Sequence, residues 1–295
     1  MALWAAIETA ISTATGDAFE ASTHRGVGGG CINSAYRLEA GGRSYFVKLN
    51  DASKAHMFQA EVEGLNEIAR TRTIRVPRPV CWGSEGGSAY IVMEYLSMGG
   101  SGKDALARLG RQLAAMHQTT SPKYGWHIDN TIGSTPQINT YCDDWIGFFQ
   151  NQRIGFQLKL AAGNGYGGRL LDKGERLQTD LAVFFRDYHP PASLLHGDLW
   201  SGNYSIEASG EPVIFDPAVY YGDRETDLAM TELFGGFSAG FYAAYRDAYP
   251  LDNDYAVRKT LYNLYHVLNH LNLFGSGYGS QAEHMMDSLL SEIRG

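Results

Sequence analysis

The sequence predicts an α+β fold with a small antiparallel sheet lobe, which carries one main helix, and a larger, mainly helical lobe. Three observations lead to this prediction. Apolar and polar residues alternate over much of residues 31–95, as they do in half-buried strands. After residue 102 the apolar residues recur at helical spacing instead. The run Gly99-Gly100-Ser101-Gly102 separates the two patterns and is typical of a flexible connection.

The elements of the first lobe follow from periodicity and turn residues. The pair Gly41-Gly42 divides one hairpin, and Gly86-Gly87 divides a second. Pro77 and Pro79 end the helical pattern between them. In chain order we expect a helix over 1–20, a hairpin over 31–50, a helix over 54–70, and strands over 80–82 and 89–95.

The second lobe is predicted to be helical apart from one short β-rich interval. We expect helices over 104–118, 143–162 and 177–188, a loop over 162–168, short strands within 194–216, and helices from there to residue 295. The domain organisation that follows is a nucleotide-binding lobe over 1–96, a hinge over 97–102, and a catalytic and acceptor-binding lobe over 103–295.

Composition narrows the class of protein. The chain has 295 residues and a net charge of −8, which argues against a general nucleic-acid surface. No apolar run is long enough for a membrane helix, and the N-terminus lacks the basic start of a signal peptide. Three widely spaced cysteines form neither a zinc motif nor a disulfide framework, as expected in a reducing compartment. We therefore expect a cytoplasmic protein that binds neither nucleic acid nor membrane.

The strongest functional signal is the run from His196 to Asn203, which reads His-Gly-Asp-Leu-Trp-Ser-Gly-Asn. Asp198 and Asn203 in it are five residues apart, and Asp216 follows an apolar, strand-like run. Phosphoryl transfer from ATP needs a carboxylate to orient and deprotonate a hydroxyl, and an amide oxygen and a second carboxylate to hold Mg²⁺. In protein kinases, these residues occur in the motif H-R-D-x-x-x-x-N, which is followed by D-F-G. The sequence therefore predicts a phosphotransferase.

Each residue of this set has a predicted role. We expect Asp198 to be the catalytic base, and Asn203 and Asp216 to hold the metal ion. His196 could serve as a base by its residue type. We favour Asp198, because it occupies the catalytic-loop position, and expect His196 to pack beneath the loop.

The first lobe supplies candidates for binding ATP. Gly28, Gly29 and Gly30 precede a strand, where glycine lets backbone amides approach phosphate; a plain hairpin turn is the alternative. Lys48 lies on the second strand of the first hairpin, where we expect it to contact the α- and β-phosphates and a helix glutamate. Glu61 is the preferred partner, since it lies beside the packed face of the following helix. We expect Glu63 and Glu67 to be solvated.

The end of the last sheet strand is the expected adenine site. Backbone groups of Glu94 and Leu96 would contact the adenine edge, and Met93 would flank it; core packing is the alternative for Met93. This prediction rests on position along the chain, since backbone contacts leave no side-chain pattern.

The acceptor would be bound beyond the catalytic loop. Trp200 either walls the acceptor site or anchors the loop. Asp223 and Arg224 follow the metal segment closely enough to contact a polar acceptor. Thr226 and Glu225 are expected to cap the next helix, and Asp227 could brace the catalytic loop.

These motifs resemble the fructosamine 3-kinases, or ketosamine kinases, which are relatives of the aminoglycoside phosphotransferases with a protein-kinase-like bilobal fold. The resemblance covers nearly the whole chain and rests on the segments 28–33, 45–48, 144–149, 196–203, 215–218, 221–230 and 233–237. Trp200 and the run over 223–230 separate the chain from general aminoglycoside or choline kinases.

The resemblance implies ATP- and Mg²⁺-dependent phosphorylation of the O3 hydroxyl of a ketosamine, which leads to deglycation of the amine. The acceptor would be a small-molecule ketosamine or a glycated protein lysine, of fructosamine, ribulosamine or erythrulosamine type, and the protein a monomer or homodimer. One alternative is a kinase for an aminoglycoside, an amino sugar or choline. Another is a nucleotide-binding pseudokinase scaffold, which the complete set of catalytic residues disfavours.

Cys31 lies in the expected phosphate loop, where nearby amides favour the thiolate. Our hypothesis is that its oxidation, including a disulfide between two chains, would lower activity. The alternative is a small loop residue without a redox role.

Overall fold

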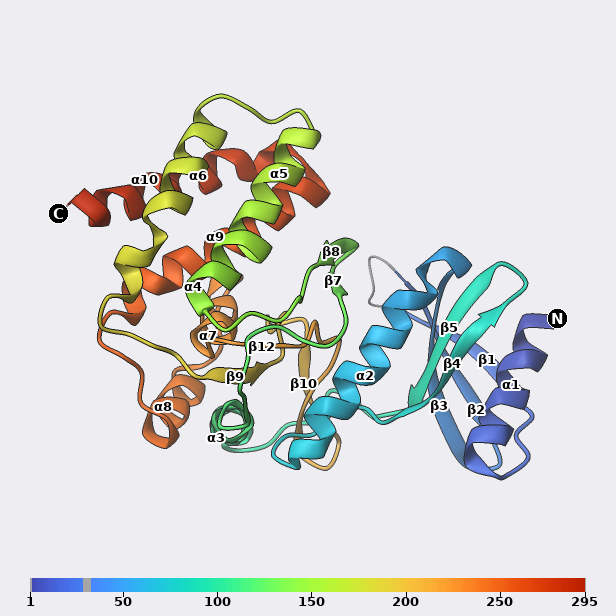
Figure 1. Cartoon of the computed structure of the whole chain (residues 1–295). Helices are drawn as coiled ribbons and strands as arrows, with labels where there is room; N and C mark the ends of the chain where they lie inside the picture. Colours follow the sequence, from blue (N-terminus) through green and yellow to red (C-terminus); the bar gives the residue numbers. More distant parts are fainter. Residues whose placement is uncertain (1, 29–32, 295) are drawn as a thin grey trace. The chain divides into compact units, whose positions relative to one another are not determined.

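The computed structural model describes residues 2–28 and 33–294. The chain forms two compact units (Figure 1). The first comprises residues 1–105 together with 204–217, and the second comprises 106–203 together with 218–295. The predicted α+β fold, with an antiparallel sheet lobe and a helical lobe, is confirmed.

The first unit is built on a five-stranded antiparallel sheet. Its strands stand in the order β1-β2-β3-β5-β4. They are β1 (Thr23–Val27), β2 (Ser34–Ala40), β3 (Arg43–Asp51), β5 (Ser88–Glu94) and β4 (Pro79–Glu85). Strand β1 adds to the two hairpins expected from the sequence, and the short 3₁₀ turn η1 (Ala52–Lys54) follows β3.

Two helices cover the two faces of this sheet (Figure 1). Helix α1 (Ala2–Thr15) buries Ile7 and Ile11 against the face that carries Val47 and Val92. Because side chains alternate along a strand, Lys48 projects from the opposite face, which helix α2 (Ala55–Thr71) covers. The alternation of side chains along β3 therefore directs Lys48 toward α2.

A hairpin from late in the sequence completes the first unit. Strands β10 (Tyr204–Ile206) and β11 (Pro212–Ile214) pair with each other, and Val213 also bridges to Arg75. The Gly100 amide donates to the Ile206 carbonyl at 2.9 Å. A Cβ atom at Gly100 would lie 2.0 Å from the Glu207 carbonyl oxygen, so this close approach requires glycine. The glycine-rich segment is therefore held against the hairpin.

The second unit is mainly helical. Its helices and turns are α3 (Ala105–His117), α4 (Trp145–Phe148), η2 (Phe149–Gly155), α5 (Phe156–Gly163), α6 (Arg169–Asp180), η3 (Leu181–Phe185), α7 (Glu225–Leu233), α8 (Ala239–Ala248), α9 (Tyr255–Phe274), η4 (Ser276–Tyr278) and α10 (Gly279–Arg294). Its short strands are β6 (Thr120–Ser121), β7 (Asn130–Ile132), β8 (Thr135–Gln137), β9 (Ala192–Leu195) and β12 (Tyr220–Gly222).

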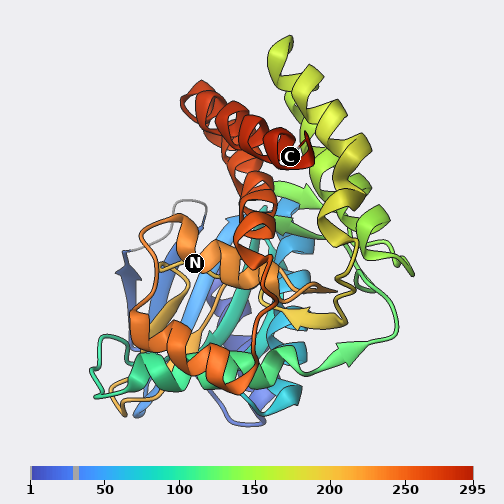
Figure 2. The ribbon, with the colours of Figure 1, turned by 90° about the vertical axis from the view of Figure 1, so that its left-hand side faces the viewer.

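Helices α3 and α8 pack closely against each other (Figure 2). A Cβ atom at Gly110 of α3 would lie 2.3 Å from the Phe241 carbonyl oxygen of α8. Glycine at this crossing lets the two helices approach at backbone distance. The contact brings the end of α3 beside Tyr245.

Two predicted helices differ from those observed. The helix expected over 177–188 is observed as α6, from Arg169 to Asp180, followed by the 3₁₀ turn η3. Its buried face is formed by Leu170, Gly174 and Leu177, and the helix begins eight residues earlier than predicted. The helix expected over 143–162 is interrupted by the π-helical segment η2.

None of the helices in the described ranges has the length and apolar character needed to cross a bilayer.

Candidate active site

Lys48 is the centre of an ion cluster in the first unit, in which Lys48 and Glu61 are buried. Its Nζ atom lies 2.6 Å from Glu61 Oε1 and also donates to Asp216 Oδ1. Burial of the Lys48 ammonium would lower its pKa, but the charges of Asp216 and Glu61 outweigh this effect and raise it above its ordinary value. Lys48 is therefore a permanent cation, which suits a phosphate ligand.

Asp216 follows β11 by two residues and has a φ of 56°. Aspartate is one of the few residues that adopt this left-handed conformation readily. The carboxylate remains 46% exposed while it accepts from Lys48. This geometry leaves oxygen lone pairs of Asp216 accessible to a further cation.

The expected adenine site at the end of β5 contains buried apolar side chains and one ion-paired carboxylate. Met93 and Leu96 are buried. The Arg75 guanidinium donates to the Glu94 carboxylate at 2.7 and 2.8 Å. The Glu94 side chain therefore takes part in an ion pair within the fold. The Leu96 amide has no hydrogen-bond partner in residues 2–28 and 33–294.

Only part of the glycine-rich loop lies within the described residues. Gly28 directly follows β1, and a Cβ atom placed on it would meet no described atom within 4 Å. Gly29, Gly30 and Cys31 lie outside the described residues. The phosphate-binding and redox roles of these four residues stay predictions.

In the second unit, the catalytic-loop segment is held by its backbone. Gly197 has a φ of 84°, and a Cβ atom there would lie 2.0 Å from the Ala218 carbonyl oxygen. The Asp227 carboxylate accepts the His196 amide at 2.7 Å and the Gly197 amide at 2.8 Å. His196 is fully buried, and its Nδ1 atom faces the Asp198 amide at 3.3 Å. These contacts fix the backbone immediately before Asp198.

Asp198 and Asn203 are brought together by the turn between them. The Asn203 Nδ2 group donates to the Asp198 carbonyl at 2.8 Å and reaches Asp198 Oδ2 at 3.3 Å. The Oδ1 atom of Asn203 has no partner among the residues that the structure describes. An amide oxygen in this arrangement is a suitable ligand for a hard cation.

Trp200 lies on the same turn with 38% of its surface exposed. Its ring packs over Gly202, where a Cβ atom would lie 2.3 Å from the ring carbons. The Asn203 amide donates to the Trp200 carbonyl at 3.0 Å. Trp200 thus both stabilises the turn and presents an aromatic surface.

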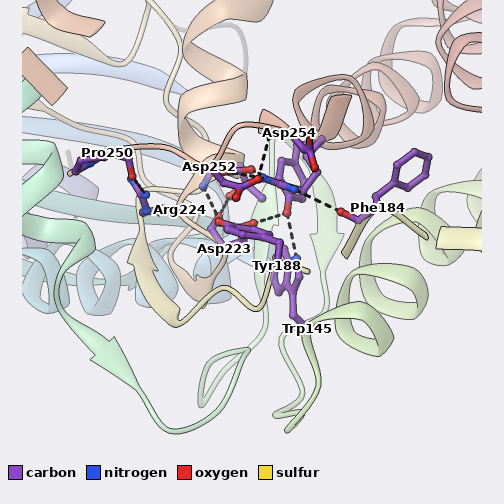
Figure 3. Close-up of polar contacts among 12 residues, drawn as sticks. Trp145, Phe184, Tyr188, Asp223, Arg224, Pro250, Asp252 and Asp254 are labelled. Atoms are coloured by element: carbon purple, nitrogen blue, oxygen red, sulfur yellow. Dashed lines mark hydrogen bonds and ion pairs between the residues drawn. The ribbon is translucent and has the colours of Figure 1, made fainter. Parts of the chain in front are cut away.

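Asp223 lies in a buried polar network (Figure 3). Its carboxylate accepts from the Tyr188 hydroxyl at 3.0 Å, the Tyr262 hydroxyl at 2.5 Å and the Glu225 amide at 3.0 Å. Burial raises the pKa of Asp223 above its ordinary value, although the Tyr262 hydrogen bond opposes this. The contacts of Asp223 lie inside the second unit.

Arg224 is also buried. Its guanidinium donates to the Tyr245 hydroxyl at 3.1 Å and the Tyr249 carbonyl at 3.0 Å, and it lies 3.5 Å from the centre of the Tyr249 ring. Contact of Asp223 and Arg224 with an acceptor stays a prediction.

Two buried polar residues, His117 and Tyr245, were not singled out from the sequence. The His117 ring contacts Asp227 and Tyr245, which come from segments more than a hundred residues away. A histidine at the end of an amphipathic helix has no local pattern that would identify this role.

A Mg²⁺ ion would need oxygen ligands from few protein residues. In residues 2–28 and 33–294, no group of three or more histidines, cysteines and acidic residues is arranged to hold a metal. Mg²⁺ commonly takes one or two protein ligands and completes its shell with phosphate oxygens and water. The partly exposed Asp216 carboxylate fits this requirement in the first unit. The roles of Asn203 and Asp216 as metal ligands stay predictions.

The comparisons with known proteins agree with this fold. The family model described as Fructosamine kinase matches residues 3–292. A probable ketoamine kinase of Synechocystis is 50% identical over 288 residues, which cover 97% of each chain. The chloroplastic protein-ribulosamine 3-kinase of Arabidopsis thaliana is 46% identical over 91% of this chain and 82% of its own length.

Solved structures show the same similarity. A crystal structure from Haemophilus somnus, provisionally assigned as a fructosamine-3-kinase, has a TM-score of 0.89 and 28% identity, with 97% of each chain covered. A thermostable mutant of aminoglycoside phosphotransferase APH(4)-Ia has a TM-score of 0.60 and 16% identity over 97% of this chain and 98% of its own. This second likeness shows the fold alone.

The family model and the relatives define the class of protein as a kinase. The chain belongs to the fructosamine kinase family and is an enzyme of the ketosamine kinase type.

Proposed function

We propose that this enzyme transfers the γ-phosphoryl group of ATP to the O3 hydroxyl of a ketosamine of the fructosamine or ribulosamine type. The observation that carries the proposal is the Lys48–Glu61–Asp216 cluster in a member of the ketosamine kinase family. Family membership favours ketosamines over aminoglycosides and choline. The acceptor would be a free ketosamine or a glycated lysine of a protein.

In this proposal Lys48 binds the α- and β-phosphates of ATP, and Glu61 holds the lysine in place. A solved APH(4)-Ia mutant forms a ternary complex with ADP and hygromycin B, so a protein of this fold does bind an adenine nucleotide. We assign the adenine contact to the backbone of Glu94 and Leu96. The unpartnered Leu96 amide supports this assignment.

Asn203 and Asp216 are the proposed Mg²⁺ ligands. They flank the β10–β11 hairpin, whose register pairs Tyr204 with Ile214. A bound Mg²⁺ would neutralise charge on the phosphates. Lys48 already donates to Asp216, so the same carboxylate would serve both the lysine and the ion.

Asp198 is the proposed base. Its carboxylate would accept the O3 proton as O3 forms its bond to the γ-phosphorus, while the bond to the β,γ-bridging oxygen breaks and ADP leaves. Trp200 would contact the sugar with its exposed ring surface. Asp223 and Arg224 would support this region from within the second unit.

The test is an ATP-consumption assay with a panel of acceptors. It should include a fructosyl amine, a ribulosyl amine, an aminoglycoside, choline and a glycated protein. We expect selective turnover of the ketosamines. Preference for the aminoglycoside or choline would overturn the substrate assignment, and ATP binding without turnover of any acceptor would favour a scaffold role.

A further inference from the structure

His117 lies at the last position of α3 and is fully buried, yet both of its ring nitrogens have polar partners. Nδ1 lies 2.7 Å from the Tyr245 hydroxyl on α8, and Nε2 lies 3.1 Å from Asp227 Oδ2 on α7. The close packing of α3 on α8 makes the first contact possible (Figure 2). The ring therefore connects two other helices inside the second unit.

The partners fix the direction of these hydrogen bonds. Arg224 Nη1 lies 3.1 Å from the Tyr245 hydroxyl and can only donate, so the tyrosine oxygen accepts from it. The tyrosine proton is then directed to His117 Nδ1, and the ring carries its own proton on Nε2. Asp227, as a carboxylate, accepts that proton. The donors thus run in one direction, from Arg224 through Tyr245 and His117 to Asp227.

This hydrogen-bonded line ends at the backbone of the catalytic loop. Asp227 Oδ2 accepts the His196 amide at 2.7 Å, and Oδ1 accepts the Gly197 amide at 2.8 Å. The next residue in the chain is Asp198. A change in the position of the Asp227 carboxylate would therefore move the peptide units that present the proposed base.

We propose that His117 is a positioning residue, which orients Asp227 and thereby fixes the backbone that presents Asp198 for catalysis. Tyr245 and Arg224 complete the same line. The inference rests on the proposed function in one respect, that Asp198 acts as the base. It gives Arg224 a role through the loop, which is separate from the predicted contact with an acceptor.

The electrostatic surroundings of His117 favour the neutral form of its ring, which these hydrogen bonds require. The charged and titratable groups near the His117 ring are Asp227, Arg224, Asp223 and Tyr245. Burial lowers the pKa of His117, and Asp227 only partly offsets this. The ring is therefore neutral at neutral pH, as the direction of the hydrogen bonds requires.

The kinetic test uses matched tyrosine variants. Tyr245→Phe removes one hydroxyl from the line, whereas Tyr255→Phe removes a hydroxyl that bonds Glu232 at 2.7 Å and takes no part in the line. Since small displacements of a catalytic group can cost about 100-fold in rate, we expect Tyr245→Phe to lower kcat by about 3- to 10-fold. The KM for ATP should stay within about threefold. Tyr255→Phe should retain the kcat of the unmodified enzyme.

Variants of His117 test the central residue. His117→Phe should lower kcat by about 10- to 100-fold, and His117→Gln, which retains an N–H donor for Asp227, should recover most of that loss. An equally poor His117→Gln enzyme that folds would contradict the proposal. If His117→Phe does not fold, Tyr245→Phe and His117→Gln carry the test.

Amide hydrogen exchange separates this inference from the proposed function. In Tyr245→Phe, the His196 and Gly197 amides should exchange faster than in the unmodified protein, and in Tyr255→Phe they should not. Unchanged exchange at both amides together with unchanged kcat in Tyr245→Phe would overturn the inference. If the unmodified enzyme turns over no ketosamine, the proposed function fails, while the exchange measurement still tests the line.

Discussion

Lys48 Nζ lies 2.6 Å from Glu61 Oε1, and both side chains are at least four-fifths buried. The first comes from strand β3 and the second from helix α2. A buried charge that loses its partner is costly. The pair therefore determines both the position of the lysine and the stability of the first unit.

Glu61→Gln should weaken the use of ATP. The uncharged glutamine side chain attracts the Lys48 ammonium less strongly than the Glu61 carboxylate does. The ammonium therefore shifts toward Asp216. We expect the KM for ATP to rise and kcat/KM to fall by about 10- to 100-fold, as for loss of one charged contact of about 1.5–3 kcal/mol. The matched control is Glu63→Gln on the same helix, and an equal loss in that variant would contradict the role of Glu61.

Gly197→Ala should disrupt the catalytic loop. The backbone has a φ of 84°, and the new Cβ atom would lie 2.0 Å from the Ala218 carbonyl oxygen. Strain of this kind costs on the order of 1–3 kcal/mol, and the steric conflict adds to it. We expect a lower Tm and loss of most activity. Gly163→Ala in α5, where a Cβ atom meets nothing within 4 Å, should leave both unchanged, which thermal unfolding and a kinase assay can check.

Arg258→Met should destabilise the second unit. The Arg258 guanidinium holds the fully buried Glu225 carboxylate at 2.8 and 3.2 Å and Asp252 at 2.6 Å. Removal of one partner of a buried pair costs about 3–5 kcal/mol. The double variant Arg258→Met/Glu225→Gln should recover part of that free energy of unfolding in urea titrations. No recovery would show that the arginine stabilises the fold by packing alone.

The stability of the protein should depend on pH through Glu225. Burial raises the pKa of Glu225 to about 7 from an ordinary value of 4.5, and the Asp223 charge adds to this rise. Between these two values the folded state holds a proton that the unfolded state has released. The contribution of Glu225 to stability is therefore complete below pH 4.5 and is lost as the pH rises through 7, by up to about 1.4 kcal/mol per pH unit.

The variant Glu225→Gln removes the titrating carboxyl group and tests this pH dependence. We expect the unfolding free energy of the unmodified protein, minus that of the variant, to be larger at pH 5 than at pH 7. Urea unfolding at the two pH values measures both terms. A difference that stays constant with pH would show that Glu225 is ionised throughout.

Local sequence patterns identify the site residues whose position depends on a single strand, helix or turn. The alternation along β3 indicates which face carries Lys48, and the helical spacing of α2 indicates that Glu61 lies beside its packed side. The five-residue spacing of Asp198 and Asn203 is likewise local, since a single turn joins them. Such features can be read from the sequence because the residues involved are close along the chain.

The surroundings of Asp223 and Arg224 could not be predicted in this way. Charged residues before a helix are commonly exposed caps, and these two are buried. Their partners are Tyr188, Tyr262 and the backbone of Pro250, which only the tertiary fold brings near. The line from Arg224 to His117 is hidden for the same reason.

The central claim is that Asp198 removes a proton from a ketosamine hydroxyl during phosphoryl transfer from ATP. Its most direct test is the kcat for ketosamine phosphorylation by Asp198→Asn, compared with Asp143→Asn, which changes an exposed aspartate of the second unit. Loss of a general base lowers rates by about 100- to 10,000-fold. We predict a loss in this range for Asp198→Asn with an unchanged Tm, and full activity for Asp143→Asn. A folded Asp198→Asn enzyme that phosphorylates the ketosamine at the unmodified rate would contradict the account.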